Sequence, residues 1–354
     1  MSLSDDICAF IQADTRDDAT FDDLARRLFA MQCESIPLVG ALAAREGVTP
    51  DKVTHWRDIP AVPTAAFKAA TLFGGSAVAQ TFTSSGTSGA SKSQSVFSEE
   101  GLALMGLAVR VNAARWLFPD GRSTRILVLA PSPQMAPHMI MAWGMSALIS
   151  EYGLEGSRFL IGSDGLDAGA VVAELLDAAR DGVPITLIGA SFGFVHLLDG
   201  LVAADVRIAS APGSRTMDAG GYKGRSRELT RGELDSAISE RLGVPAQRAV
   251  NLLGMTELAS QFYDGVLGQG SATPRRKQNP PWTRTVVVAP DTLRPVADGE
   301  RGLLVHLDLA NIERPAVIRT DDMGFADADG FHVIGRATGA DSRGCSLSVE
   351  ELVQ

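Results

Sequence analysis

The alternation of short apolar runs with helix-like segments in the middle of the chain constrains the fold most. Three runs have the length and composition of buried strands: residues 126–130, 185–188 and 248–253. Helical segments lie between and beside them. Asp167 is placed to cap one of these helices, and Thr230 with Glu233 forms a capping box at the start of another. This alternation predicts an α/β fold with parallel or mixed sheets flanked by helices.

The pattern changes near residue 275, where strand-like segments joined by short turns begin: residues 285–288, 302–308, 316–320 and 331–334. Residues 327–330, Asp-Ala-Asp-Gly, are typical of a hairpin turn. We therefore expect an α/β part over residues 1–275 and a β-rich subdomain over residues 276–354, ending in a hinge-like arm. Near the N-terminus, a helix is predicted to begin at Thr20, with Asp22 and Asp23 in its first turn.

Composition excludes several classes of protein. Of the 354 residues, 45% are apolar and 21% charged, which is ordinary for a folded, soluble chain. The 42 acidic residues outnumber the 32 lysines and arginines, so neither a nucleic-acid partner nor an anionic membrane is predicted. Prolines divide the apolar residues 126–150, so we expect no membrane span there. Three widely spaced cysteines predict a reducing, cytoplasmic environment.

A run of Ser, Thr and Gly over residues 84–92 is the strongest local signal. Strand-like residues 81–83 and 95–97 flank the run, which ends at Lys92. Glycines let consecutive backbone N–H groups face an anion, while hydroxyls add donors and lysine adds charge, as a triphosphate requires. The spacing is neither that of a Walker A loop nor that of the Rossmann fingerprint. A flexible surface loop is the alternative.

This run resembles the phosphate-loop signature of the adenylate-forming enzymes. Three further segments resemble other motifs of that superfamily in the same order: residues 251–258 (NLLGMTEL), 319–324 (RTDDMG) and 335–336 (GR). The chain is most similar to the short branch that contains the acyl-protein synthetase of bacterial bioluminescence (LuxE-like), including its ending RGCSLSVEEL. The resemblance implies the large N-terminal domain of an adenylate-forming enzyme.

The resemblance also implies ATP and Mg²⁺ as cofactors and a small-molecule carboxylic acid as substrate. The residues implied to surround the β- and γ-phosphates are Ser84, Ser85, Gly86, Thr87, Ser88, Gly89 and Lys92. Glu257 is implied to hold Mg²⁺, and Thr256 to donate to the α-phosphate or the acyl oxygen. The alternative for Glu257 is an ordinary charge in the first turn of a helix.

Two other segments are implied to hold the nucleoside. Residues 218–222 resemble the segment that packs on adenine, and the implied binding residues are Gly220, Gly221 and Tyr222. Asp322 is implied to accept from the ribose hydroxyls, and Arg336 to support the ribose and mark the hinge. Taken singly, the glycines could serve a tight turn, and Asp322 could be a turn residue beside Asp321.

Three positions depart from the family motifs: Leu253 replaces an aromatic residue, Asp321 a glycine and Ser91 a proline. Full-length members also carry a C-terminal lid domain with a lysine for adenylation, whereas this sequence ends soon after Arg336. Lys68 and Lys223 are candidate substitutes for that lysine, or a partner completes the site. Each of these two lysines has the alternative of a solvated surface residue.

Cys345 is the implied acyl acceptor, because bioluminescence relatives carry the acyl group on a cysteine near the C-terminus. Arg343 and a following helical segment favour the thiolate, although an unreactive cysteine is the alternative. Residues 135–143, including His138, and 191–196 are predicted to line an apolar cleft for the acid.

We therefore expect an acid–thiol ligase that activates a fatty or aryl carboxylic acid and transfers the acyl group to a protein thiol for a partner reductase. The alternatives are a CoA ligase and a non-catalytic nucleotide-binding subunit of a reductase complex. The sequence identifies neither the acid nor the oligomeric state.

Overall fold

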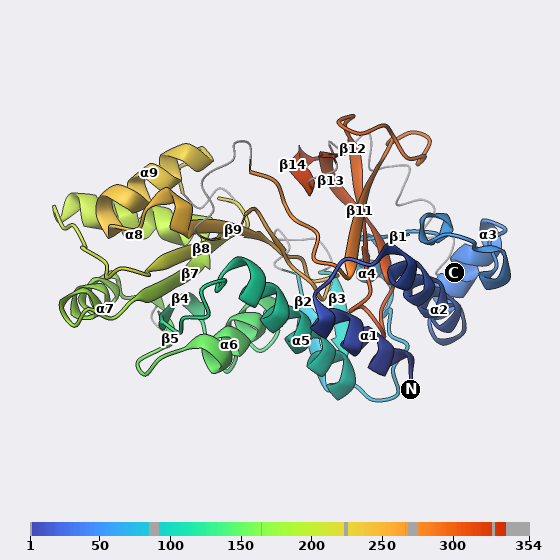
Figure 1. Cartoon of the computed structure of the whole chain (residues 1–354), viewed down its shortest axis with the longest axis horizontal. Helices are drawn as coiled ribbons and strands as arrows, with labels where there is room; N and C mark the ends of the chain where they lie inside the picture. The colour runs from blue at the N-terminus through green and yellow to red at the C-terminus, as the bar shows by residue number, and fades with distance from the viewer. Residues whose placement is uncertain are drawn as a thin grey trace. The chain divides into compact units, whose positions relative to one another are not determined.

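The computed structural model describes residues 2–84, 92–163, 165–222, 226–265, 267, 275–327 and 330–337. The chain divides into two compact units (Figure 1). Unit 1 comprises residues 1–111, 255–260 and 276–354, and unit 2 comprises residues 112–254 and 261–275. Unit 1 therefore combines the two ends of the chain with one short internal segment.

Unit 2 is built on a seven-stranded sheet. In spatial order its strands are β10 (Phe262–Tyr263), β9 (Ala249–Leu253), β8 (Arg215–Ala219), β7 (Ile185–Ala190), β4 (Arg125–Pro131), β5 (Arg158–Gly162) and β6 (Gly165–Leu166). Strands β9 through β5 pair in parallel, whereas β10 and β6 are short antiparallel strands at the two edges. The carboxyl ends of the parallel strands therefore share one edge of the sheet, where ligands of open α/β sheets bind.

Helices cover both faces of this sheet (Figure 1). They are α6 (Ile140–Tyr152), α7 (Ala168–Arg180), α8 (Ser191–Ala203) and α9 (Arg231–Leu242), and a 3₁₀ turn η3 (Ala246–Arg248) precedes β9. One buried cluster joins α7, α8 and α9 to Leu127 and Leu129 of β4. Since neighbouring strand residues point to opposite faces, Ile126 and Val128 face the other side, where α6 packs on β4.

The first part of unit 1 is helical. Its elements are α1 (Leu3–Ala13), α2 (Asp18–Ser35), α3 (Pro37–Arg45), η1 (Pro50–Lys52), η2 (Trp56–Asp58) and α4 (Ala66–Ala69). Helix α5 (Glu99–Trp116) then runs across the boundary into unit 2. No helix of the described ranges is long and apolar enough to cross a membrane.

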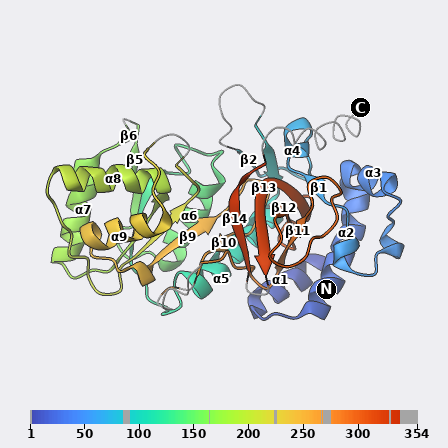
Figure 2. The same cartoon turned by 90° about the horizontal axis from the view of Figure 1, so that it is seen from above.

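Two sheets complete unit 1. The five-stranded sheet has the order β1 (Val62–Pro63), β13 (Val317–Asp327), β12 (Gly302–Asp308) and β11 (Thr283–Val288), with β14 (Gly330–Arg336) also paired to β13. Figure 2 shows β11 to β14 as a curved sheet. A separate antiparallel hairpin consists of β2 (Gln80–Thr83) and β3 (Gln94–Phe97), which flank the predicted phosphate loop.

The expected fold class is confirmed: helices flank parallel and mixed sheets, and the C-terminal part is rich in strands. One local prediction and one alternative are wrong. Helix α2 begins at Asp18, because the Asp17 side chain caps it by accepting from the N–H groups of Ala19 and Thr20. Asp321 and Asp322 lie inside β13, whose pairing with β12 and β14 continues past Thr320, so Asp322 is no turn residue.

Candidate functional site

The β2–β3 hairpin fixes the base of the predicted phosphate loop. The Ser84 N–H donates to the Ser93 carbonyl and the Ser93 N–H donates to Ser84 Oγ, both over 3.0 Å. Below this closure, Phe82 and Phe97 pack edge to face with ring centroids 5.4 Å apart. Lys92 is exposed beside the closure. The hairpin therefore holds the ends of the loop rigidly, and the remaining loop residues, Ser85 to Gly89, lie outside the described part.

Thr256 and Glu257 lie in the 255–260 segment, which belongs to unit 1. Both are buried, Glu257 with 7% of its surface exposed. Glu257 is in a turn, so its alternative as a first-turn helix charge is wrong. The buried amide of Asn311 fixes the backbone here: Nδ2 donates to the Glu257 carbonyl over 2.9 Å, and Oδ1 accepts from the Ala259 N–H over 2.9 Å.

Ser260 ends this segment in a second buried contact. Its N–H and its hydroxyl each donate to the carboxylate of Asp308 over 2.8 Å, and Trp282 Nε1 donates to Ser260 Oγ. Burial raises the pKa of Asp308, while the hydrogen bonds from Ser260 oppose that rise. The backbone that carries Thr256 and Glu257 is therefore held by side chains of β12 and of the connection that follows it.

Asp322 and Arg336 face each other across β13 and β14. They are register partners, and Arg336 Nε lies 3.4 Å from Asp322 Oδ1. Burial raises the pKa of Asp322, and the charge of Arg336 opposes the rise. The Arg336 side chain is largely exposed, whereas that of Asp322 is mostly buried. The structure thus brings together the two residues implied to hold the ribose.

Gly220 and Gly221 follow β8 at the carboxyl edge of the sheet in unit 2. Gly220 has φ +71°, a conformation that glycine adopts without strain. The Ser191 hydroxyl lies 2.9 Å from the Gly220 carbonyl and 2.8 Å from Asp218 Oδ2, so it can donate to either. Tyr222 donates its hydroxyl to the Leu229 carbonyl over 2.8 Å, and burial raises its pKa.

Asp218 is a further buried residue of the 218–222 segment. Besides Ser191, its carboxylate accepts from Asn251 Nδ2 over 2.8 Å and pairs with the guanidinium of Arg231. The side chain therefore joins β8, β9 and the first residues of α8 and α9. An aspartate two residues before a glycine pair at a strand end is the sequence signal for this arrangement.

The ion-pair network continues from Arg231 to the end of unit 2. Arg231 also pairs with Asp235, and Arg275 lies 3.2 Å from Asp235 and 3.6 Å from Asp264. Asp264 Oδ1 in turn accepts from the Asn251 N–H over 2.7 Å. These charges hold the strand β9 that leads along the chain into Thr256 and Glu257.

The residues predicted to line an acid-binding cleft differ in their exposure. Phe194 and Val195 of α8 are fully buried, and Phe194 belongs to the hydrophobic core that α7, α8 and α9 form with β4. These two side chains therefore do not line an open cleft. Met135, His138 and Met139 are exposed. Lys68 is exposed on α4, whereas Lys223 and Cys345 lie outside the described part, as does most of the expected arm.

The chain is similar to proteins of a known family. The sequence profile of the family described as "Acyl-protein synthetase, LuxE" matches residues 47–353. The long-chain-fatty-acid–luciferin-component ligase of Aliivibrio fischeri is 26% identical over 313 residues, 84% of this chain and 79% of the relative. The ligase of the same name from Vibrio harveyi is 25% identical over the same shares.

Solved structures share the fold. A 2-hydroxyisobutyryl-CoA ligase, in complex with 2-HIB-AMP and CoA, has a TM-score of 0.67 and 14% sequence identity. The match covers 90% of this chain and 68% of the ligase chain.

Proposed function

We propose, since the chain belongs to the acyl-protein synthetase LuxE family, that it activates a carboxylic acid with ATP and passes the acyl group to a protein thiol. The proposed acid is a fatty acid or an aryl carboxylate, and the proposed partner is an acyl reductase. The names of the two bacterial relatives, which join a long-chain fatty acid to a luciferin component, support this assignment.

The burial and anchoring of Glu257 is the observation that carries the proposal. Its backbone is held by Asn311, and the segment that contains it ends in the contacts of Ser260 with Asp308. A carboxylate costs free energy to bury, so a rigid segment that carries one is expected where the charge serves a ligand.

The donor set fits Mg²⁺ bound together with a nucleotide. Such an ion is held by one or two carboxylates, and phosphate oxygens and water complete its octahedral shell. Glu257 supplies one carboxylate, and no cluster of three or more His, Cys, Asp or Glu side chains that could cage a metal occurs within the described ranges. Bound there, the ion would offset the negative charge of the triphosphate.

The reaction is an in-line displacement at the α-phosphorus. A carboxylate oxygen of the acid forms a bond to the α-phosphorus, the bond to the β-phosphate bridge breaks, and pyrophosphate leaves with that electron pair. The chain contributes position and charge: Lys92 and the loop donors bind the phosphates, and Thr256 donates to the α-phosphate or the acyl oxygen. Asp322 accepts from the ribose hydroxyls.

Exchange of labelled pyrophosphate into ATP tests this step. We expect exchange that depends on Mg²⁺ and on one class within a panel of fatty and aryl acids. Glu257→Gln should lower it at least about 100-fold, because removal of a single transition-state contact commonly costs that much. Asp199→Asn, at an exposed ion pair with Arg227, is the matched control and should retain the wild-type rate. Absence of exchange across the whole panel would contradict the proposal.

The acceptor requires a second experiment. Transfer to Cys345 predicts an added acyl mass on the protein that hydroxylamine removes and that Cys345→Ser does not acquire. Formation of acyl-CoA instead would identify a CoA ligase. Tight ATP binding without exchange, with a reductase present, would identify a non-catalytic subunit.

A further inference from the structure

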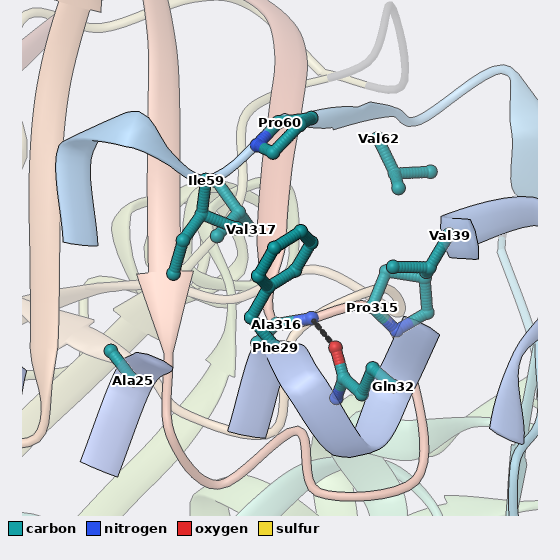
Figure 3. Close-up of a pocket in the computed structure, with 10 residues that line it drawn as sticks. All are labelled: Ala25, Phe29, Gln32, Val39, Ile59, Pro60, Val62, Pro315, Ala316 and Val317. Carbon is teal, nitrogen blue, oxygen red and sulfur yellow. Dashed lines mark hydrogen bonds between the residues drawn. The ribbon is translucent and has the colours of Figure 1, made fainter. Parts of the chain in front are cut away.

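The connection between β12 and β13, residues 309–316, is buried and polar at once. Asn311 has no exposed surface and Arg314 has 2%. Helix α2 holds the connection from one side: Gln32 Nε2 donates to the carbonyls of Asn311 and Arg314, and its Oε1 accepts from the Ala316 N–H over 2.9 Å. Figure 3 shows this last contact beside an apolar cavity of about 10 Å³. The connection is thus fixed independently of the residues implied to bind ATP.

One contact of the connection reaches the 255–260 segment. The Asn311 amide donates to the Glu257 carbonyl and to the Pro315 carbonyl, and its oxygen accepts from Ala259. All of these groups are buried, so loss of the amide would leave the Glu257 carbonyl without this donor. A buried carbonyl without a donor is costly, so we expect the backbone at Glu257 to shift away from its native position relative to β12.

A second contact reaches the hairpin that carries the phosphate loop. The two carboxylate oxygens of Glu313 accept from the N–H and the hydroxyl of Ser98, directly after β3, over 3.1 and 2.6 Å. The guanidinium carbon of Arg314 lies 3.5 Å from the ring centroid of Phe97. One short connection therefore contacts both the β2–β3 hairpin, at the end of β3 away from the loop, and the backbone of Glu257.

The buried position of the Arg314 guanidinium costs folding free energy. Its Nη2 donates to Asn311 Oδ1, whereas within the described ranges neither its Nε nor its Nη1 has a hydrogen-bond partner. Burial lowers its pKa to about 9, and the charges of Asp308, Glu313 and Glu257 oppose that shift. A buried cation with unpaired donors destabilises a fold, so packing alone gives no reason for an arginine here.

We propose that residues 311–314 position Glu257 relative to the β2–β3 hairpin, with Asn311 acting on Glu257 and Glu313 with Arg314 acting on the hairpin. This inference rests on the proposed function, because that function gives Glu257 and Lys92, which lies just before β3, a common ligand, Mg²⁺ with ATP. Asn311, Glu313 and Arg314 are positioning residues that act through the residues they hold.

Calorimetric binding of Mg²⁺–ATP to the full chain tests the inference without turnover. Asn311→Ala should weaken binding about tenfold, the effect of one buried hydrogen bond. The same substitution in a Glu257→Gln background should change binding less than about twofold, because the group it positions has lost its charge. Arg284→Met is the control for the loss of another buried polar side chain in unit 1 that does not contact residues 309–316 in the described hydrogen bonds, and it should bind within about twofold of wild type.

Glu313 keeps the inference testable if Asn311→Ala does not fold. Glu313→Ala should weaken Mg²⁺–ATP binding, whereas Glu313→Gln should restore it, because an amide can accept from the Ser98 N–H and donate to its hydroxyl. Wild-type affinity in Asn311→Ala, an equal loss in the Glu257→Gln background, or failure of Glu313→Gln to restore binding would overturn the positioning role.

The proposed function can fail separately. The wild-type chain could bind Mg²⁺–ATP, and the Asn311→Ala and Glu257→Gln variants could change binding as expected, while no acid supports pyrophosphate exchange. That result would keep the positioning role and contradict the activation reaction. A wild-type chain that does not bind Mg²⁺–ATP overturns both.

Discussion

Replacing Asp218 by asparagine should destabilise unit 2 far more than the loss of one negative charge suggests. The side chain has only 2% of its surface exposed, and its carboxylate receives three donors: the Ser191 hydroxyl, Asn251 Nδ2 and the guanidinium of Arg231. An asparagine has the same shape but presents one acceptor oxygen and one donor nitrogen.

Either orientation of the new amide leaves a conflict. If its nitrogen replaces Oδ1, it faces the Arg231 guanidinium; if it replaces Oδ2, it faces the amide of Asn251. Ser191 can adapt, because its hydroxyl can donate to the Gly220 carbonyl instead. In either case two N–H donors face each other in the buried site, which costs about 1–3 kcal/mol of unfolding free energy. The negative charge that balanced Arg231 is also lost. Since Arg231 is partly exposed and keeps Asp235, we expect a total near 3 kcal/mol, below the upper range for a broken buried pair.

Thermal unfolding followed by calorimetry measures this loss. For a unit of this size, about 3 kcal/mol lowers the melting temperature by roughly 6–12 °C. Asp199→Asn removes the same charge from an exposed ion pair with Arg227, and it should shift the melting temperature by less than about 2 °C. Equal shifts for the two variants would refute the argument that Asp218 is the centre of a buried network.

Three further predictions concern unfolding and nucleotide binding. Burial lowers the pKa of His306 to about 3, so near pH 5 the unfolded chain binds a proton that the folded chain does not. The free energy of unfolding should therefore fall by about 2 kcal/mol between pH 7 and pH 5. Urea unfolding of His306→Gln should show a shallower pH dependence than that of wild type. In Gly220→Ala the new Cβ has space, but alanine is strained at the positive φ of this position. We expect the free energy of unfolding to fall by about 1–2 kcal/mol and ATP binding to weaken. An unchanged affinity for ATP would argue against a role of this turn in holding adenine. Asp17→Ala should lower the melting temperature more than Thr20→Ala, since Asp17 accepts from two backbone N–H groups of α2; the reverse order would place the start of the helix at Thr20.

Local signals in the sequence predict many elements of the fold. Asp167 caps α7 and Thr230 with Glu233 forms the capping box of α9, as their spacing predicts. The strands around residues 126–130 and 185–188 follow from their apolar runs. These features succeed because a cap or a buried strand is specified by residues that are neighbours in the chain.

The hydropathy pattern does not predict the elements whose buried residues are polar. Strand β8 is fully buried but contains Arg215 and Asp218, whose partners Asp120 and Arg231 lie 95 and 13 positions away in sequence. Hydropathy cannot identify such a strand, because its burial depends on charges that are paired only in the folded chain. The role of Asn311 is hidden for the same reason: its contacts with Glu257 and Ala259 span more than fifty positions of the sequence.

The division of the chain between the units has a consequence for its synthesis on the ribosome. Within the described residues, the hydrogen bonds of the Gln32 side chain on α2 all go to residues 311–316, so this buried amide lacks these partners until almost the whole chain has been made. Unit 2 is complete at residue 275 and can fold sooner. Helices α1 and α3 and the Trp56 ring can cover the apolar side of α2 early in synthesis. A ribosome stalled before residue 311 would still leave the buried amide of Gln32 without these partners.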